Sequence, residues 1–126
     1  MIKLMICVIL LISLTGCNVE IEIVPEHTRI TPQRAQEMME QYNVIILDVR
    51  TSAEFQAGHI QGAVLLPHDR IRAEAEYLIP DKDQIVLVYC QRGNRSNTAA
   101  LTLVDMGYRA VYDFGGIVEW PGPVER

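Results

Sequence analysis

The sequence has few cysteines, no internal repeat, no low-complexity tract and a minority of basic residues. Its 126 residues include three cysteines, and 11 Lys and Arg stand against 16 Asp and Glu, which gives a net charge of −5. Such an acidic chain is a poor candidate for general nucleic-acid binding. The longest apolar run, residues 4–14, is shorter than the roughly 20 residues that a transmembrane helix needs. With 49% apolar and 21% charged residues, the chain has the composition and length of one globular domain.

The first 17 residues have the pattern of an export signal. Lys3 precedes the apolar run, and the small residues Thr15 and Gly16 lead to Cys17. This order resembles the bacterial lipoprotein signal, in which cleavage falls before the cysteine and the cysteine carries a lipid. The resemblance implies a signal peptide at residues 1–16, lipidation of Cys17, and a domain anchored to a membrane of the cell envelope, in the periplasm or at the outer cell surface. The alternative is an uncleaved N-terminal anchor with an incidental cysteine.

Cleavage and lipidation would leave one free thiol. Cys7 departs with the signal peptide and Cys17 is blocked, so Cys90 is the only free cysteine and no internal disulfide forms. A lone thiol in an exported protein is either buried and inert or kept for its reactivity. Residues 17–27 are expected to be the lipidated cysteine and a tether, and ten extended residues reach about 35 Å. The alternation of apolar and acidic residues at 19–24 equally fits an edge strand.

From residue 28 to residue 126, strand and helix patterns alternate. Thr31 and Pro32 fit the start of a helix, and Gly107 is placed to end a later one. The expected strands lie at residues 44–47, within 62–67, at 85–89 and at 110–112. Three helices are expected. The first begins at Pro32 after the cap at Thr31, the second presents Ile71, Ala75 and Leu78 on one face, and the third spans residues 98–106. The alternation predicts an α/β fold, with a central parallel sheet and helices on both faces.

The loop after the clearest strand, residues 85–89, carries the reactive groups. It consists of Cys90, Gln91, Arg92, Gly93, Asn94, Arg95 and Ser96. The loop follows the carboxyl end of a strand, where parallel sheets bind ligands, and its backbone N–H groups can cradle an anion. The dipole of the following helix and the two arginines favour a Cys90 thiolate and an anionic substrate beside it. The alternative is a buried, structural cysteine beside surface arginines.

Three segments resemble the signatures of single-domain rhodaneses. They are residues 47–63, the loop from Cys90 to Ser96, and the segment from Gly115 to Trp120. They occur in the expected order, and the resemblance covers residues 28–122. It implies a small α/β fold and sulfur transfer through a cysteine persulfide, as in a thiosulfate sulfurtransferase. Cys90 would be the catalytic nucleophile, and residues 91–96 would bind the substrate.

Loop length separates this family from phosphatases that resemble it. Those enzymes carry Cys-x5-Arg, whereas the spacing from Cys90 to Arg95 is Cys-x4-Arg. The shorter loop favours sulfur transfer over phosphate chemistry. In the implied ping-pong reaction, the thiolate takes the outer sulfur of a donor such as thiosulfate or a polysulfide and passes it to cyanide, a thiol or a partner protein. Arg92 is expected to steer the anionic donor, and Gln91 stands where some relatives have Arg.

Four further residues of the first signature are expected to support the loop. Asp48 and Arg50 follow a predicted strand, so they should lie at the same sheet edge as the cysteine. Arg95 is expected to brace the loop against an acid such as Asp48. Glu54 and His59 are expected to hold the segment after that strand. A catalytic-base role for His59 is not needed, because the anion cradle already yields a thiolate.

The remaining motif residues point to packing rather than chemistry. Trp120 is expected to pack in the core or at an edge, and the prolines after it end the last helix, earlier than in many relatives. This early end leaves the packing of the C-terminal edge open. His27 and His68 lack the spacing of a metal site, so neither a metal nor an organic cofactor is implied.

Two functions of other classes remain beside the enzyme. One is a binding module without turnover, which retention of Cys90, Arg92 and Arg95 argues against. The other is a persulfide carrier that delivers sulfur to a specific envelope protein, since the same loop would serve both roles. A modest, acidic surface favours a monomer.

Overall fold

The structure, a computed structural model, describes residues 27–126. The expected signal peptide, the lipidation site Cys17 and all of the tether except His27 lie outside the described residues. The elements follow one another as β1 (Thr28–Arg29), α2 (Pro32–Gln41), β2 (Val44–Asp48), α3 (Ser52–Ala57), β3 (His59–Ile60), β4 (Val64–Leu65), a 3₁₀ turn η1 (His68–Arg70), α4 (Ile71–Leu78), β5 (Ile85–Cys90), α5 (Asn94–Asp105), β6 (Val111–Gly116), a 3₁₀ turn η2 (Ile117–Glu119) and β7 (Val124–Glu125).

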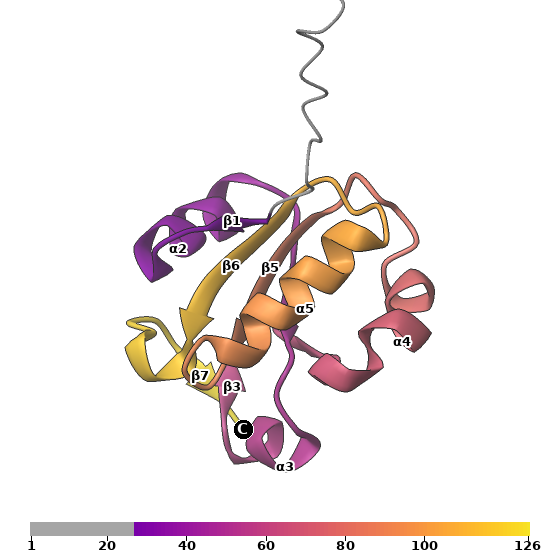
Figure 1. The fold of residues 1–126 in the computed structure, drawn as a ribbon. Coiled ribbons are helices and arrows are strands. Elements are labelled where there is room, and N and C mark those ends of the chain that lie inside the picture. The colour runs from indigo at the N-terminus through magenta and orange to yellow at the C-terminus, as the bar shows by residue number, and fades with distance from the viewer. Residues whose placement is uncertain (1–26) are drawn as a thin grey trace, which may run out of the picture.

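Five strands form a central sheet in the order β1-β6-β5-β2-β4, and each neighbouring pair is parallel. β5 lies in the middle, between β2 and β6 (Figure 1). Strands buried on both faces read as continuous apolar runs, which is why β2 and β5 were recognisable from the sequence. Because the strands are parallel, Asp48, Cys90 and Gly116 share the edge formed by the carboxyl ends of β2, β5 and β6. The predicted α/β fold is confirmed.

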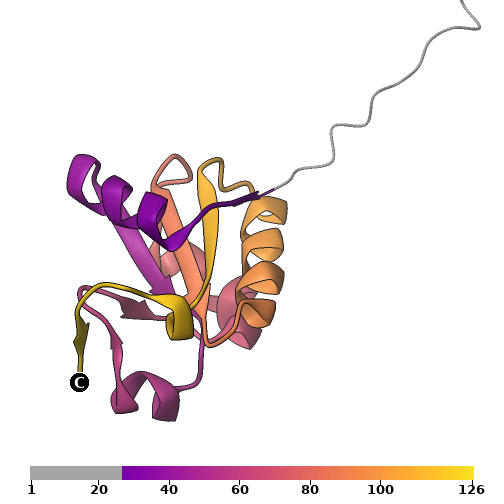
Figure 2. The ribbon, with the colours of Figure 1, turned by 90° about the vertical axis from the view of Figure 1, so that its left-hand side faces the viewer.

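Helices cover both faces of the sheet, with α2 on one side and α4 and α5 on the other (Figure 2). The core on the α2 side consists of Ala35, Met38, Ile60, Leu87, Tyr89 and Phe114. The larger core on the other side includes Ile71, Ala75, Ile79, Val86, Val88 and Leu103. Within the described part of the chain, every helix is too short or too polar to span a bilayer.

Local sequence signals fix the ends of two helices as expected. The Thr31 side chain accepts a hydrogen bond from the backbone N–H of Arg34 at 3.0 Å, and Pro32 occupies the first position of α2. Gly107 follows α5 with a φ of 98°, a left-handed conformation that glycine adopts without steric cost. These ends position α2 and α5 against the sheet.

Two element boundaries and one core residue differ from the expectation. α5 begins at Asn94 and not at residue 98, because Gly93 has a φ of 108° and starts the helix within the loop. β6 continues to Gly116 instead of ending at residue 112, although Asp113 and the two glycines resemble a turn in the sequence. On α4, Leu78 is 37% exposed, whereas Ile79, just past the helix, is 1% exposed and fills the core.

The C-terminal segment closes the edge that the sequence left open. The last helical turn ends at Glu119, as the prolines predict, and the chain then continues into β7. β7 pairs antiparallel with β3, with His59 opposite Glu125 and Ile60 opposite Val124. This two-stranded sheet ties the end of the chain to the segment that follows α3.

Candidate active site

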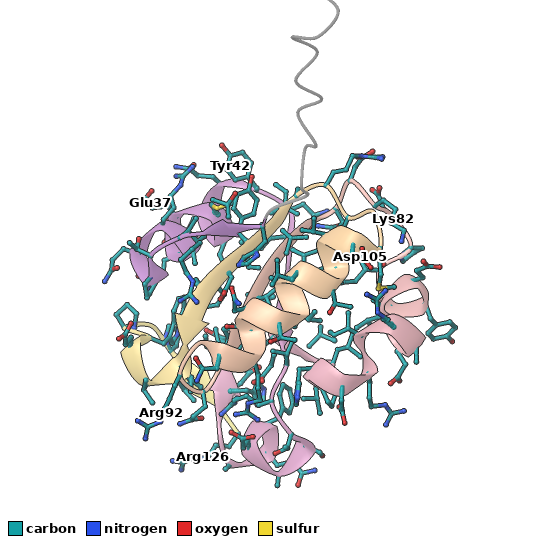
Figure 3. The ribbon with its side chains drawn as sticks, viewed as in Figure 1. Glu37, Tyr42, Lys82, Arg92, Asp105 and Arg126 are labelled. Carbon is teal, nitrogen blue, oxygen red and sulfur yellow. The ribbon has the colours of Figure 1, made fainter. Side chains whose placement is uncertain are left out.

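Cys90 is the last residue of β5, and it is 1% exposed. It lines a pocket of about 220 Å³ together with Gln91, Arg92, Asn94 and Arg95. The pocket lies beyond the carboxyl end of the central strand, where ligands of parallel sheets bind. Arg92 marks this end of the molecule in Figure 3, far from Lys82 at the opposite end.

Groups of the loop surround the sulfur of Cys90. The backbone N–H of Gly93 donates a hydrogen bond to Sγ at 3.0 Å, and Ser96 Oγ lies 3.5 Å from Sγ. Burial alone would raise the pKa of the Cys90 thiol. Hydrogen bonds from the Ser96 side chain and from the backbone N–H groups of Ser96, Gly93 and Arg92 outweigh burial and lower that pKa below its ordinary value. The loop therefore favours the thiolate.

Asp48 and Arg50 form a buried pair beside the loop. Arg50 donates to both oxygens of Asp48, with its Nη2 at 2.7 Å, and the Tyr89 hydroxyl donates to Asp48 Oδ2 at 2.5 Å. Burial and the nearby Asp48 raise the pKa of Tyr89. Arg50 also donates to Gln91 Oε1 at 3.1 Å and to the carbonyl of Gly58 at 2.7 Å. The pair thus connects β2 with the cysteine loop and with the end of α3.

The expected brace for Arg95 exists, but its partner is Glu54 and not Asp48. Arg95 Nη1 and Nη2 lie 2.7 and 2.9 Å from the two carboxylate oxygens of Glu54. The hydrogen bonds from Arg95 hold the pKa of Glu54 at about 2, well below its ordinary value. The carboxylate oxygens of Asp48 already accept hydrogen bonds from Arg50 and Tyr89, so they are not available to a second arginine.

His59 supports the segment between α3 and β3. Its ring stacks on Phe55 with centroids 3.7 Å apart, Nδ1 lies 2.9 Å from the Phe55 carbonyl, and Nε2 lies 3.2 Å from Glu125. Both ring nitrogens are engaged away from Cys90. Trp120 packs against Phe114 with ring centroids 5.5 Å apart, which confirms its expected packing role.

The two glycines of the third signature let β6 approach the loop closely. A Cβ on Gly116 would lie 2.2 Å from the Gln91 carbonyl oxygen and 2.6 Å from Arg92 Cα. Gly116 has an ordinary extended conformation, so the requirement there is for space rather than for an unusual φ. This contact explains why a residue without a side chain stands opposite Cys90 in the sheet.

Two charged residues beside the loop, Arg29 on β1 and Asp113 on β6, were not predicted from the sequence. Asp113 is fully buried, and Arg29 lies 3.1 Å from its Oδ2. Asp113 could have been found as the one acidic residue within an otherwise apolar strand. No sequence motif connected Arg29 with the site, because it lies far from the cysteine loop in sequence.

For residues 27–126, no group of three His, Cys, Asp or Glu side chains is arranged to hold a metal ion.

A parallel α/β domain with a cysteine of lowered pKa at the end of its central strand defines a class of cysteine-dependent enzymes and their relatives. Within that class, residues 31–122 match the model of the rhodanese-like domain. The chain belongs to the rhodanese-like domain family.

Several relatives carry names that describe an activity. The chain is 37% identical over 71 residues to thiosulfate sulfurtransferase PspE of Escherichia coli, covering 56% of this chain and 68% of that protein. It is 36% identical over 97 residues to thiosulfate sulfurtransferase GlpE of Pseudomonas putida, covering 75% of this chain and 86% of that protein. It is also 29% identical to the tRNA uridine(34) hydroxylase of Photorhabdus laumondii, of which the match spans only 26%.

Solved structures share the fold. A rhodanese with anions from Escherichia coli superposes with a TM-score of 0.62 at 33% identity, covering 65% of this chain and 96% of that chain. A rhodanese-related protein from Thermoplasma volcanium gives a TM-score of 0.69 at 28% identity, covering 79% of this chain and 98% of that chain. A Rhodopseudomonas palustris protein of unknown function, described as a possible tyrosine phosphatase, gives a TM-score of 0.68 at 26% identity, with coverages of 79% and 85%.

Proposed function

We propose that this chain is a sulfurtransferase that carries sulfane sulfur on Cys90 from thiosulfate or a polysulfide to a thiophilic acceptor. The observation that carries the proposal is the hydrogen bond from the Gly93 N–H to Cys90 Sγ, in a pocket lined by two arginines. The similarity to proteins named thiosulfate sulfurtransferase supports the same reaction class.

The first half-reaction forms a persulfide. The Cys90 thiolate attacks the outer sulfur of thiosulfate, a new S–S bond forms at Cys90, and the S–S bond of the donor breaks. Sulfite leaves with the electron pair of that bond, so no oxidant or reductant is required. Arg92, at the rim of the pocket, is the side chain proposed to attract the anionic donor.

The second half-reaction returns the enzyme to its starting state. A thiophile such as cyanide attacks the terminal sulfur, thiocyanate leaves, and the Cys90 thiolate is restored. The loop N–H groups that favour the thiolate also suit the anionic persulfide, because they are preorganised toward negative charge on sulfur. The buried Asp48–Arg50 pair and the Arg95–Glu54 pair hold the loop in this geometry and need not touch the substrate.

Turnover kinetics test this reaction. The purified chain should convert thiosulfate and cyanide to sulfite and thiocyanate with ping-pong kinetics, and Cys90→Ala should abolish the activity. Arg34→Gln is the matched control, because Arg34 is an exposed arginine of α2 paired with Glu37. Activity toward a phosphate ester instead of thiosulfate would favour the phosphatase alternative. Slow turnover with fast delivery of sulfur to an envelope protein would favour the carrier alternative.

The N-terminal segment suggests where the reaction takes place. We propose that Cys17 is lipidated and that the domain is a monomer anchored in the cell envelope. β1 begins at Thr28, opposite Tyr112 near the start of β6, whereas Cys90 lies level with Gly116 at the other end of that strand. A domain tethered through β1 would therefore direct the pocket away from the membrane surface.

Anchoring can be tested separately from activity. The wild-type chain should incorporate a labelled fatty acid in a bacterial host and sediment with membranes, and Cys17→Ser should lose the label. Cys7→Ser is the control, since Cys7 lies within the expected signal peptide. Equal labelling of wild type and Cys17→Ser would contradict the lipoprotein assignment.

A further inference from the structure

Asp113 is a fully buried acid in the strand next to Cys90. It lies in β6 opposite Val88, two residues before Cys90 in β5. Its Oδ1 accepts a hydrogen bond from the N–H of Gly115 at 2.9 Å, whereas its Oδ2 accepts no well-aligned hydrogen bond. A buried carboxylate oxygen in this position needs a nearby positive charge as its partner.

Arg29 is the positive group closest to Asp113. Its Nη2 lies 3.1 Å from Asp113 Oδ2, and the two residues face each other across the β1–β6 pairing. His27 Nε2 is farther away, at 3.8 Å, which exceeds hydrogen-bond distance. Arg29 is half-exposed and comes from an edge strand of only two residues, so Asp113 relies on a group that the solvent can also reach.

The same guanidinium also contacts the cysteine loop. Arg29 Nη2 donates to the carbonyl of Gly93 at 3.4 Å, and a Cβ on Gly93 would lie 3.4 Å from Arg29 Nη1. Gly93 is the residue whose N–H donates to Cys90 Sγ. Arg29 therefore joins the buried acid to the residue whose N–H reaches Cys90 Sγ, and it is not among the residues that line the pocket.

We propose that Arg29 is a positioning residue for Cys90, which it supports by pairing with Asp113 and by holding Gly93. The other charged groups around the loop do not replace it. Arg92 and Arg95 belong to the pocket side of the loop, and the acids Asp48 and Glu54 are each paired with an arginine of their own. Loss of Arg29 would leave an uncompensated negative charge beside the strand of Cys90, which disfavours the thiolate.

The pH dependence of Cys90 alkylation tests the proposal in the full chain, purified in detergent. Iodoacetamide is a neutral reagent, so a change in surface charge does not steer it, and mass spectrometry of the Cys90 peptide separates this site from Cys7 and Cys17. Arg29→Gln should move the alkylation profile to higher pH and slow the reaction at neutral pH about three- to tenfold. Arg34→Gln, an exposed arginine away from the loop, should leave the profile unchanged.

Two further variants separate positioning from general stability. Arg29→Lys keeps the charge but loses the planar fork, so its profile should lie between those of wild type and Arg29→Gln. Arg29→Gln combined with Asp113→Asn removes both charges, so part of the alkylation rate should return. The proposal is overturned if Arg29→Gln matches Arg34→Gln, or if a folded double variant is no faster than Arg29→Gln.

The test does not depend on the proposed sulfur transfer. Alkylation requires only the thiolate. The shift of the alkylation profile in Arg29→Gln can therefore be measured even in a chain that does not turn over thiosulfate. Conversely, an unchanged alkylation profile of Arg29→Gln with normal turnover would exclude the positioning role of Arg29 and leave the sulfurtransferase proposal unaffected.

Discussion

Cys90 is a buried thiol that the loop nevertheless favours in its charged form. Two opposing effects act on it, since burial disfavours the thiolate and several hydrogen bonds stabilise it. The hydrogen bonds prevail because the loop presents the backbone N–H groups of Arg92, Gly93 and Ser96 to the sulfur. Ser96 contributes the only side-chain hydroxyl that contacts the sulfur among the described residues.

Ser96→Ala should therefore make Cys90 less acidic. The substitution removes the Oγ that lies 3.5 Å from Sγ and leaves the packing volume almost unchanged. Loss of a hydrogen bond to the anion raises the pKa of the thiol, so the thiolate fraction at neutral pH should fall about threefold or more. The ultraviolet absorbance of the thiolate, followed as a function of pH, measures this change. Thr98→Ala, on the exposed side of the same helix, is the control, and an identical titration of the two variants would contradict the assignment.

At the scale of elements, the Arg95–Glu54 pair joins α5 to α3. The pKa of Glu54 is about 2 in the folded chain, against 4.5 for an ordinary glutamate. A lowered carboxyl pKa means that the pair stabilises the fold above pH 4.5 and that this contribution disappears as the pH falls from 4.5 through about 2.

Glu54→Gln should remove this pH dependence. The variant should be less stable than wild type at neutral pH by about 1 kcal/mol, because the pair is partly exposed and screened by solvent. The difference should shrink as the pH approaches 2. Urea unfolding at several pH values measures it, and Glu37→Gln, which breaks an exposed pair with Arg34, is the control. A constant difference between wild type and Glu54→Gln at all pH values would refute the explanation.

The contact between β6 and the cysteine loop makes a second prediction at this scale. Gly116→Ala should destabilise the domain by about 1–3 kcal/mol or more and disturb the pocket, because its Cβ would overlap the Gln91 carbonyl. Gly107→Ala, which meets nothing within 4 Å but has a φ of 98°, should cost about 1 kcal/mol and leave Cys90 reactivity unchanged. Thermal unfolding and alkylation distinguish the two. Equal reactivity of Cys90 in both variants would contradict the close-approach argument.

Features that depend on interactions between residues close in sequence could be predicted from the sequence. The apolar runs of β2 and β5, the cap at Thr31 and the stop at Gly107 depend on neighbouring residues, and they occur where expected. The partner of Arg95 depends on where α3 lies above the loop, which no spacing in the sequence reveals. Asp48 was expected because it follows a predicted strand at the same sheet edge as Cys90, but Arg50, only two residues away, occupies it.

Tertiary context also explains the residues that were missed. Arg29 and Asp113 are 84 positions apart and meet only because β1 pairs with β6. The extent of β6 was underestimated for a related reason, since Asp113 and the following glycines are unfavourable in an isolated strand and are stabilised by contacts with Arg29 and the loop.

At the scale of the whole molecule, the C-terminal strand holds the segment that carries Glu54 and His59. Deletion of residues 124–126 removes the β3–β7 pairing and the contact between Glu125 and His59. The deletion should cost about 1 kcal/mol and lower the melting temperature by about 4–8 °C. Deletion of Arg126 alone, which removes only a hydrogen bond to the Ala57 carbonyl, is the control. An unchanged melting temperature after the longer deletion would show that β7 does not stabilise the fold.

The central claim is that Cys90 accepts sulfur as a persulfide, and the mass of the chain tests it most directly. The intact protein should gain the mass of one sulfur atom after treatment with thiosulfate and lose it on addition of cyanide, with thiocyanate released. Cys90→Ala should gain nothing. A folded wild-type chain with reduced Cys90 that takes up no sulfur from thiosulfate or polysulfide, or an equal gain by Cys90→Ala, would contradict the account.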